Sequence, residues 1–147
     1  MADDISRPVG PVDYPVLQQV CDLLLKEEPL VESATFDNPV NPSELVVEFS
    51  MGLDAPGRME LTWWKRGAYR YHYTEPDGVD FRFDNHPKEG TPDAHFHPPP
   101  DARRAEPSFL AGVTQPQVVT RTVIARWRRT VVEGRELEAL NRDESRP

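Results

Sequence analysis

The side chains best suited to chemistry form a short run near the middle of the chain, at Arg82, Asp84 and His86. Arginine binds phosphate oxygens through parallel hydrogen bonds, and histidine can give or take a proton near neutral pH. Alternate residues of a strand share one face, so Arg82 and Asp84 lie together and His86 follows at the strand end. This group would suit reactions at a phosphate. The alternative is a surface lattice of charges, in which Arg70 and Arg82 pair with Asp84 and Asn85 forms a turn.

A second candidate site is the pair His95 and His97, which one residue separates and three prolines follow. Both imidazoles of such a pair project to one side of an extended segment, so they could bind zinc or another transition metal with Asp84 or Asp93. They could equally act as acid and base at a phosphodiester. A closed structural zinc site is disfavoured because Cys21 is the only cysteine. A solvated loop that carries these histidines by chance is a further alternative.

A predicted antiparallel sheet would position these side chains. Three strands are expected over 59–64, 68–75 and 79–84, joined by three-residue hairpin loops that place Gly67 and Gly78 in the left-handed conformation. This loop length fixes the register and gathers the large apolar residues on one face. The expected pairs are Trp63 with Tyr69, Leu61 with Tyr71, Met59 with Tyr73, Tyr73 with Phe81 and Tyr71 with Phe83.

The other face of this sheet is expected to be polar and to carry the candidate functional residues. On it His72 lies opposite Arg82, and Arg70 lies opposite Asp84. The alternation assigns to this face Glu48, Glu60, Thr62, Trp64, Arg70, His72, Thr74, Asp80, Arg82 and Asp84. Tyr71 and Tyr73 belong to the core, although tyrosine can stack on bases.

Two helices are predicted to flank the sheet. Asp13 can cap a helix that runs to about Lys26. Thr114 begins a sequence that resembles a capping box, followed by a helix to about Val132 with Gly134 as its stop. Both helices are expected to cover the aromatic face and to leave the polar face open.

The remaining segments complete an α+β fold. Residues 30–36 and 45–51 carry strand signals, whereas 85–107 has no period and predicts a long loop rich in histidine and proline. The expected architecture is an N-terminal helix, an antiparallel meander of four to five strands, this loop and a C-terminal helix. The expected division is a loose lead-in over 1–12, a single domain over 13–134 and a polar tail over 135–147.

The composition indicates a soluble protein adapted to a salty cytoplasm. The chain has 25 acidic and 17 basic residues and a net charge of −8, and its only lysines are Lys26, Lys65 and Lys88. Carboxylates keep a surface hydrated when salt screens other charges. No stretch approaches the ~18 apolar residues of a membrane span, and the N-terminus lacks the basic start of a signal peptide. We therefore expect a cytoplasmic protein without membrane contact.

The second predicted helix adds a basic patch to this acidic chain. Its members are Arg121, Arg126, Arg128 and Arg129. Such a patch could hold RNA or an acidic partner. The simpler interpretation is a solvated helix face, since arginines opposite an apolar stripe usually face water.

Residues 60–100 also resemble a known family. The matching motifs are Tyr69-Arg70-Tyr71-His72-Tyr73, Asp77-Gly78, and Arg82-Phe83-Asp84-Asn85-His86-Pro87 with the His-rich loop behind it. Together they resemble the TumE-like toxins of type II toxin–antitoxin pairs. The resemblance implies a small cytoplasmic α+β protein that inhibits growth and is bound and silenced by a helix-turn-helix antitoxin.

Combined with the candidate residues, the resemblance leads to the hypothesis of a metal-independent endoribonuclease. RNA supplies its own nucleophile in the 2′-hydroxyl, so the protein needs a base, an acid and a cation at the phosphate. Arg82, with Arg70 behind it, would stabilise the phosphate, and Asp84 would orient a histidine or an arginine. Asn85 and Trp64 would help to bind the substrate. The base and the acid, not assigned individually, would come from His72, His86, His95 and His97.

Two alternatives remain open at this point. One is a zinc-dependent hydrolase built on His95 and His97, whereas the ribonuclease mechanism requires no cofactor. The other is a non-catalytic interaction module whose open sheet face, with Trp64 exposed, docks a partner. The expected partners are the helix-turn-helix antitoxin and an RNA substrate, and the sequence leaves open whether the chain forms a homodimer.

Overall fold

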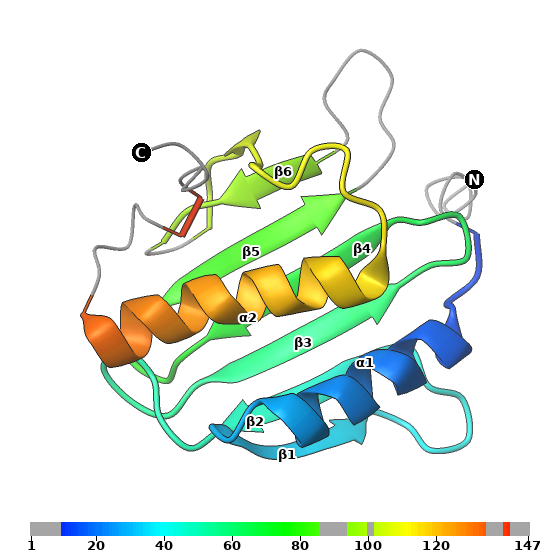
Figure 1. Cartoon of the computed structure of the whole chain (residues 1–147), viewed down its shortest axis with the longest axis horizontal. Coiled ribbons are helices and arrows are strands. Elements are labelled where there is room, and N and C mark those ends of the chain that lie inside the picture. Colours follow the sequence, from blue (N-terminus) through cyan, green and yellow to red (C-terminus); the bar gives the residue numbers. More distant parts are fainter. Residues whose placement is uncertain (1–9, 86–93, 100–101, 135–139, 142–147) are drawn as a thin grey trace.

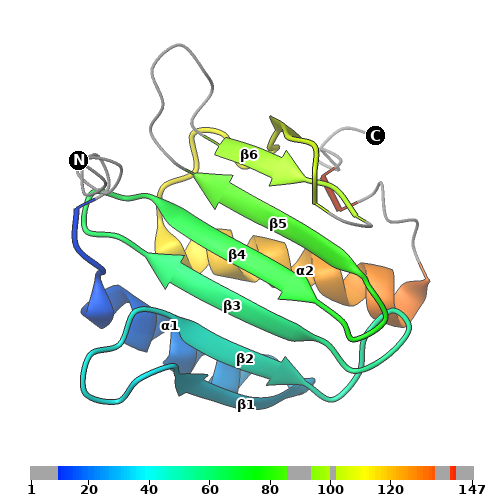
Figure 2. The ribbon, with the colours of Figure 1, turned by 180° about the vertical axis from the view of Figure 1, so that it is seen from behind.

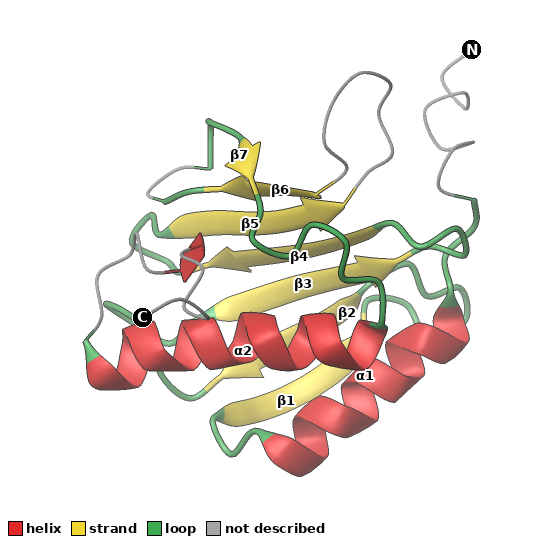
Figure 3. Cartoon of the chain, turned by 45° about the horizontal axis from the view of Figure 1, so that its top comes forward, coloured by secondary structure: helices red, strands yellow, loops and turns green. Residues whose placement is uncertain are grey.

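The fold is α+β, with two helices packed against one face of an antiparallel sheet (Figure 1). The computed structural model describes residues 10–85, 94–99, 102–134 and 140–141. The elements in chain order are α1 (Tyr14–Glu27), β1 (Val31–Phe36), β2 (Leu45–Phe49), β3 (Arg58–Trp63), β4 (Tyr69–Thr74), β5 (Asp80–Asn85), β6 (Ala94–His97), β7 (Glu106–Pro107) and α2 (Pro116–Glu133). Each strand pairs with the next one in the sequence, so the sheet is a simple meander (Figure 3).

The sheet has seven strands in the described residues, more than the four to five predicted. The additional strands, β6 and β7, lie inside the segment 85–107 that was expected to be a loop without secondary structure, and that expectation was wrong. The reason is visible in β6, where Ala94 and Phe96 are buried while His95 and His97 face the other side. Two apolar residues among prolines and histidines are too short a signal for strand assignment from sequence.

The predicted register of the two central hairpins is confirmed. Tyr71 pairs with Leu61 and Phe83, and Tyr73 pairs with Met59 and Phe81. Gly67 and Gly78 have φ of 97° and 101°, in the left-handed conformation that the predicted loops require. The aromatic residues consequently share one face, where they form the core with both helices.

Both helices begin close to the predicted residues, but only the first has the predicted cap. The Asp13 carboxylate accepts a hydrogen bond from the Val16 N–H at 3.3 Å. The helix α2 has Gln115 as its N-cap without a side-chain hydrogen bond, so the capping box expected at Thr114 is wrong. Pro116 at the first position lacks an N–H, which removes one donor that a cap would satisfy. The helix ends at Gly134 with φ of 70°, as predicted.

The helices cover the aromatic face, and the opposite face of the sheet carries no helix (Figure 2). Tyr71 links the sheet to α2, because its hydroxyl accepts a hydrogen bond from Trp63 Nε1 at 2.9 Å and lies 2.5 Å from Thr120 Oγ1. Cys21 is buried in the core, as predicted. Neither helix in the described part of the chain is long and apolar enough to cross a membrane.

Candidate active site on the open sheet face

The pairing of β5 with β6 brings the two groups of candidate residues together. Arg82 lies opposite His97, and Asp84 lies opposite His95. Directly paired residues of an antiparallel sheet project to the same side. All four side chains therefore lie on the face that Figure 2 shows without a helix. Sequence reasoning had placed the histidines in a loop and could not provide this pairing.

Three of these side chains and that of Arg70 form a contact group, which we call the His97 cluster: Arg70, Arg82, Asp84 and His97. Arg82 Nε donates a hydrogen bond to Asp84 Oδ2 at 2.6 Å. His97 Nε2 lies 3.2 Å from Arg82 Nη2 and 3.3 Å from the same carboxylate oxygen. Arg70 Nε lies 3.5 Å from Asp84 Oδ1 across the β4–β5 pair. Asp84 is only 5% exposed, so it is a buried carboxylate held between two guanidinium groups.

The surroundings of His97 favour its neutral form. Burial lowers its pKa from the ordinary value, the positive charge of Arg82 lowers it further, and the negative charge of Asp84 opposes both effects. Arg82 can only donate hydrogen bonds, and the Asp84 carboxylate can only accept them. Nε2 of a neutral His97 therefore accepts from Arg82 in the tautomer with the proton on Nδ1, and donates to Asp84 in the other tautomer. His97 is therefore equipped to accept a proton at neutral pH.

His72 lies in the same row of the sheet, opposite Arg82, but its contacts differ. Its Nε2 donates to Asp80 Oδ1 at 2.7 Å, and its Nδ1 lies 4.0 Å from Glu60 Oε1. Carboxylates thus face both ring nitrogens of His72, whereas Nε2 of His97 faces both the Arg82 guanidinium and the Asp84 carboxylate. His72 is therefore a neighbour of Arg82 in the sheet, but its hydrogen bond and ion pair are made with Asp80 and Glu60.

The other predicted site residues have different positions. His95 is partly exposed on the open face. Asn85 ends β5 opposite the buried Tyr69 and Ala94, so its side chain lies on the aromatic face of the sheet, away from the His97 cluster. Trp64 is half-buried, so the expectation of an exposed ring was wrong; a bridge with Val12 holds its backbone just beyond β3. His86, placed in the expected site, and Asp93, a proposed metal ligand, lie outside the described residues.

The described residues suggested for a metal site, His95, His97 and Asp84, do not form a cluster of metal ligands. Within the described ranges, no group of three or more histidine, cysteine, aspartate or glutamate side chains has an arrangement that could hold a metal ion. His97 and Asp84 instead share the guanidinium of Arg82, whose positive charge would oppose a metal cation at that point.

The structure adds two arginines that sequence reasoning did not single out. Arg103 and Arg104 are exposed in the segment that follows β6. The chain turns back there, because Ala102 N donates to Pro98 O at 3.1 Å. Backbone groups of Ala102 and Arg104 lie close enough to His97 to favour its protonated form slightly. Arg103 and Arg104 therefore add two exposed arginines to the segment whose backbone approaches His97.

Comparison with known protein families gives a match. The family model described as Toxin TumE matches residues 22–134, which include the whole sheet, α2 and every described member of the His97 cluster. No curated protein and no solved structure matches the chain.

Proposed function

This chain belongs to the TumE toxin family, and we propose that it arrests growth by cleaving RNA at the His97 cluster without a metal ion. Family membership supports the role of toxin in a toxin–antitoxin pair and implies an antitoxin partner. The ribonuclease reaction, the residues that carry it and a helix-turn-helix antitoxin are our proposals. The observation that carries the reaction is the contact of Arg82 with both the His97 imidazole and the buried Asp84 carboxylate.

The proposed reaction begins when Arg82 binds the non-bridging oxygens of a phosphodiester. Engagement with phosphate turns the guanidinium away from His97 and frees the Nε2 lone pair. His97 then takes the proton of the 2′-hydroxyl, and the 2′-oxygen attacks phosphorus. The bond from phosphorus to the 5′-oxygen breaks, and an acid protonates the leaving oxygen. The products are a 2′,3′-cyclic phosphate and a 5′-hydroxyl.

The other residues take supporting roles in this proposal. Asp84 holds Arg82 in place, and its burial keeps that ion pair away from competing water. His95 is the preferred acid, because it shares a strand and a face with His97 at a spacing of about 7 Å along the strand. His72 and His86 are the alternative acids. The substrate-binding residues would be Arg70, Trp64, Arg103 and Arg104.

Cleavage of RNA by the purified protein tests the proposal. We expect cleavage in the presence of EDTA, with 2′,3′-cyclic phosphate ends, and no cleavage of an oligonucleotide that carries 2′-deoxyribose throughout. Equal cleavage of the deoxy oligonucleotide would contradict a 2′-hydroxyl nucleophile. Loss of activity in EDTA, restored by zinc, would favour the metal-dependent hydrolase built on His95 and His97 instead.

The charge environment of His97 gives a prediction about its pKa that needs no activity measurement. Removal of the Arg82 charge in Arg82→Gln should raise the His97 pKa, and removal of the Asp84 charge in Asp84→Asn should lower it. Burial remains in both variants. The pKa is measured from the imidazole NMR signals as pH is varied, with His72→Gln used to assign them. Shifts of the same sign in both variants would contradict the arrangement of charges described above.

A further inference from the structure

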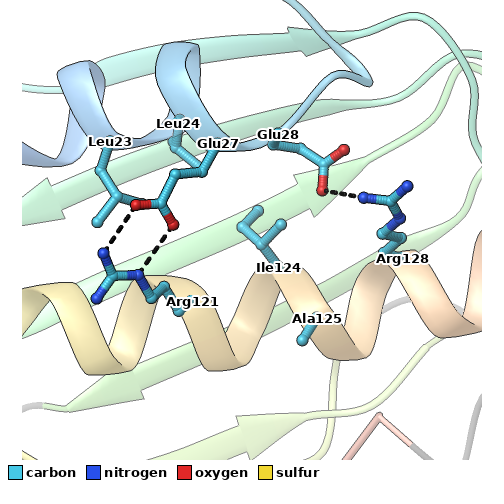
Figure 4. Close-up of a pocket in the computed structure, with 8 residues that line it drawn as sticks. All are labelled: Leu23, Leu24, Glu27, Glu28, Arg121, Ile124, Ala125 and Arg128. Carbon is cyan, nitrogen blue, oxygen red and sulfur yellow. Dashed lines mark hydrogen bonds and ion pairs between the residues drawn. The ribbon is translucent and has the colours of Figure 1, made fainter.

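A small cleft lies between the two helices, on the side of the sheet opposite the His97 cluster (Figure 4). Its volume is about 190 Å³. Its apolar lining comes from Leu23, Leu24, Ile124 and Ala125. An ion pair lies toward each end: Arg121 donates two hydrogen bonds to Glu27, at 2.8 and 3.0 Å, and Arg128 donates one to Glu28 at 3.4 Å.

The outward side of α2 beside this cleft has the residue spacing of a helix that packs against a second helix. Val118, Arg121, Ala125, Arg128 and Val132 follow one another at intervals of three, four, three and four residues, as in the seam of a coiled coil. Val118 and Val132 are 43% and 51% exposed, although valine is normally a core residue. Ala125, in the middle, is small and leaves the cleft open to an incoming side chain.

The dimensions and charges of this surface indicate what would bind there. A cleft of about 190 Å³ is smaller than the ~300–1,000 Å³ of small-molecule sites, so it suits a single anchoring side chain of a protein. The cleft is lined by Arg121 and Arg128, whose side chains are exposed, in a chain with a net charge of −8. The buried Arg126 lies instead against Phe109. An apolar centre with charged residues around it is the usual anatomy of a protein interface. Carboxylates of a partner could replace Glu27 and Glu28 at the arginines or join them.

Other occupants fit this surface less well. A second copy of the chain would set the arginines of one α2 against those of the other, and such like-charge contacts are costly. An RNA backbone would gain from the arginines but nothing from the exposed valines or the apolar cleft.

We infer that the groove formed by α1 and the outward side of α2 is the docking site for an amphipathic, acidic helix of the antitoxin. An apolar side chain of that helix enters the cleft at Ala125, and acidic residues beside it pair with Arg121 and Arg128. This inference rests on the toxin role of the chain but not on the ribonuclease reaction. Because the groove and the His97 cluster lie on opposite faces of the sheet, antitoxin binding and toxicity should be separable by mutation (Figures 1 and 2).

The test measures binding of the product of the reading frame adjacent to this gene, in a background that carries Arg82→Ala and His97→Ala so that toxicity does not interfere. We expect Ala125→Glu to weaken the complex by about 30-fold or more, the effect of a central interface residue. The new carboxylate repels an acidic helix, and Arg121 and Arg128, one turn away on each side, keep α2 stable. The control is Leu25→Glu, which changes an exposed leucine of α1 outside the cleft and should leave binding unchanged.

Several outcomes would overturn the inference. These are equal binding by the wild type and Ala125→Glu with the same circular dichroism, equal weakening by Leu25→Glu, or no complex with the wild type. A wild-type homodimer that Ala125→Glu dissociates would assign the groove to a second copy. Loss of RNA binding in Ala125→Glu with an intact protein complex would assign it to RNA. Failure of the ribonuclease proposal is seen separately, as absent RNA cleavage by a wild type that still forms the complex.

Discussion

Replacing His97 with alanine is expected to lower the rate constant of RNA cleavage by about 100- to 10,000-fold, the usual contribution of general acid–base catalysis. The same change should relieve the growth arrest caused by induced expression. The reason is the lone pair of His97, which burial and Arg82 keep free of a proton at neutral pH. Arg82→Ala should reduce cleavage by a comparable factor, because it removes the positive charge at the phosphate.

Growth after induction in a salt-tolerant host measures this effect, with the wild type compared with the double variant Arg82→Ala and His97→Ala. The matched control is Arg58→Ala, which removes an arginine of the same sheet that pairs with Glu60 at 3.2 Å, outside the His97 cluster. The control should arrest growth like the wild type. Arrest by the folded double variant would exclude the His97 cluster as the site of toxicity, and equal growth of all three strains would favour a non-catalytic interaction module.

The central hairpins could be predicted because local signals agree there. A glycine at the end of each turn fixes the loop length, and only that length places tyrosine opposite leucine, methionine and phenylalanine. The same alternation correctly placed Arg70, His72, Arg82 and Asp84 on the open face. Where signals are short or conflict, as in β6 and at the start of α2, sequence reasoning failed.

The sequence predicted individual residues of the candidate site but not the contacts between them. Alternation within β5 shows that Arg82 and Asp84 share a face. That His97 contacts both of them depends on the pairing of β5 with β6, a contact between segments that residues 86–93 separate. The lowered pKa of His97 likewise comes from burial and from a neighbour fifteen positions away. Neither effect leaves a mark in the local sequence, so the four histidines could not be ranked beforehand.

Glu75 is a residue that the sequence presents as an ordinary strand end and that the structure makes central to stability. Its carboxylate is buried and accepts hydrogen bonds from the N–H groups of Leu53, Asp54 and Ala55, at 2.6, 2.8 and 3.1 Å. It also accepts one from the Tyr73 hydroxyl at 2.6 Å. One side chain thus organises the connection between β2 and β3 and satisfies a tyrosine of the core.

Glu75→Ala is therefore expected to lower the free energy of unfolding by about 3–5 kcal/mol, because each buried donor left without a partner costs roughly 1–3 kcal/mol and some will reach water. Urea unfolding followed by circular dichroism measures the change. The matched control, Glu48→Ala, removes an exposed carboxylate of β2 and should change stability by less than about 0.5 kcal/mol. Similar losses in both variants would show that the three N–H groups find other acceptors. Because Glu75 lies outside the His97 cluster, any surviving folded Glu75→Ala protein should cleave RNA at the wild-type rate, which separates its structural role from catalysis.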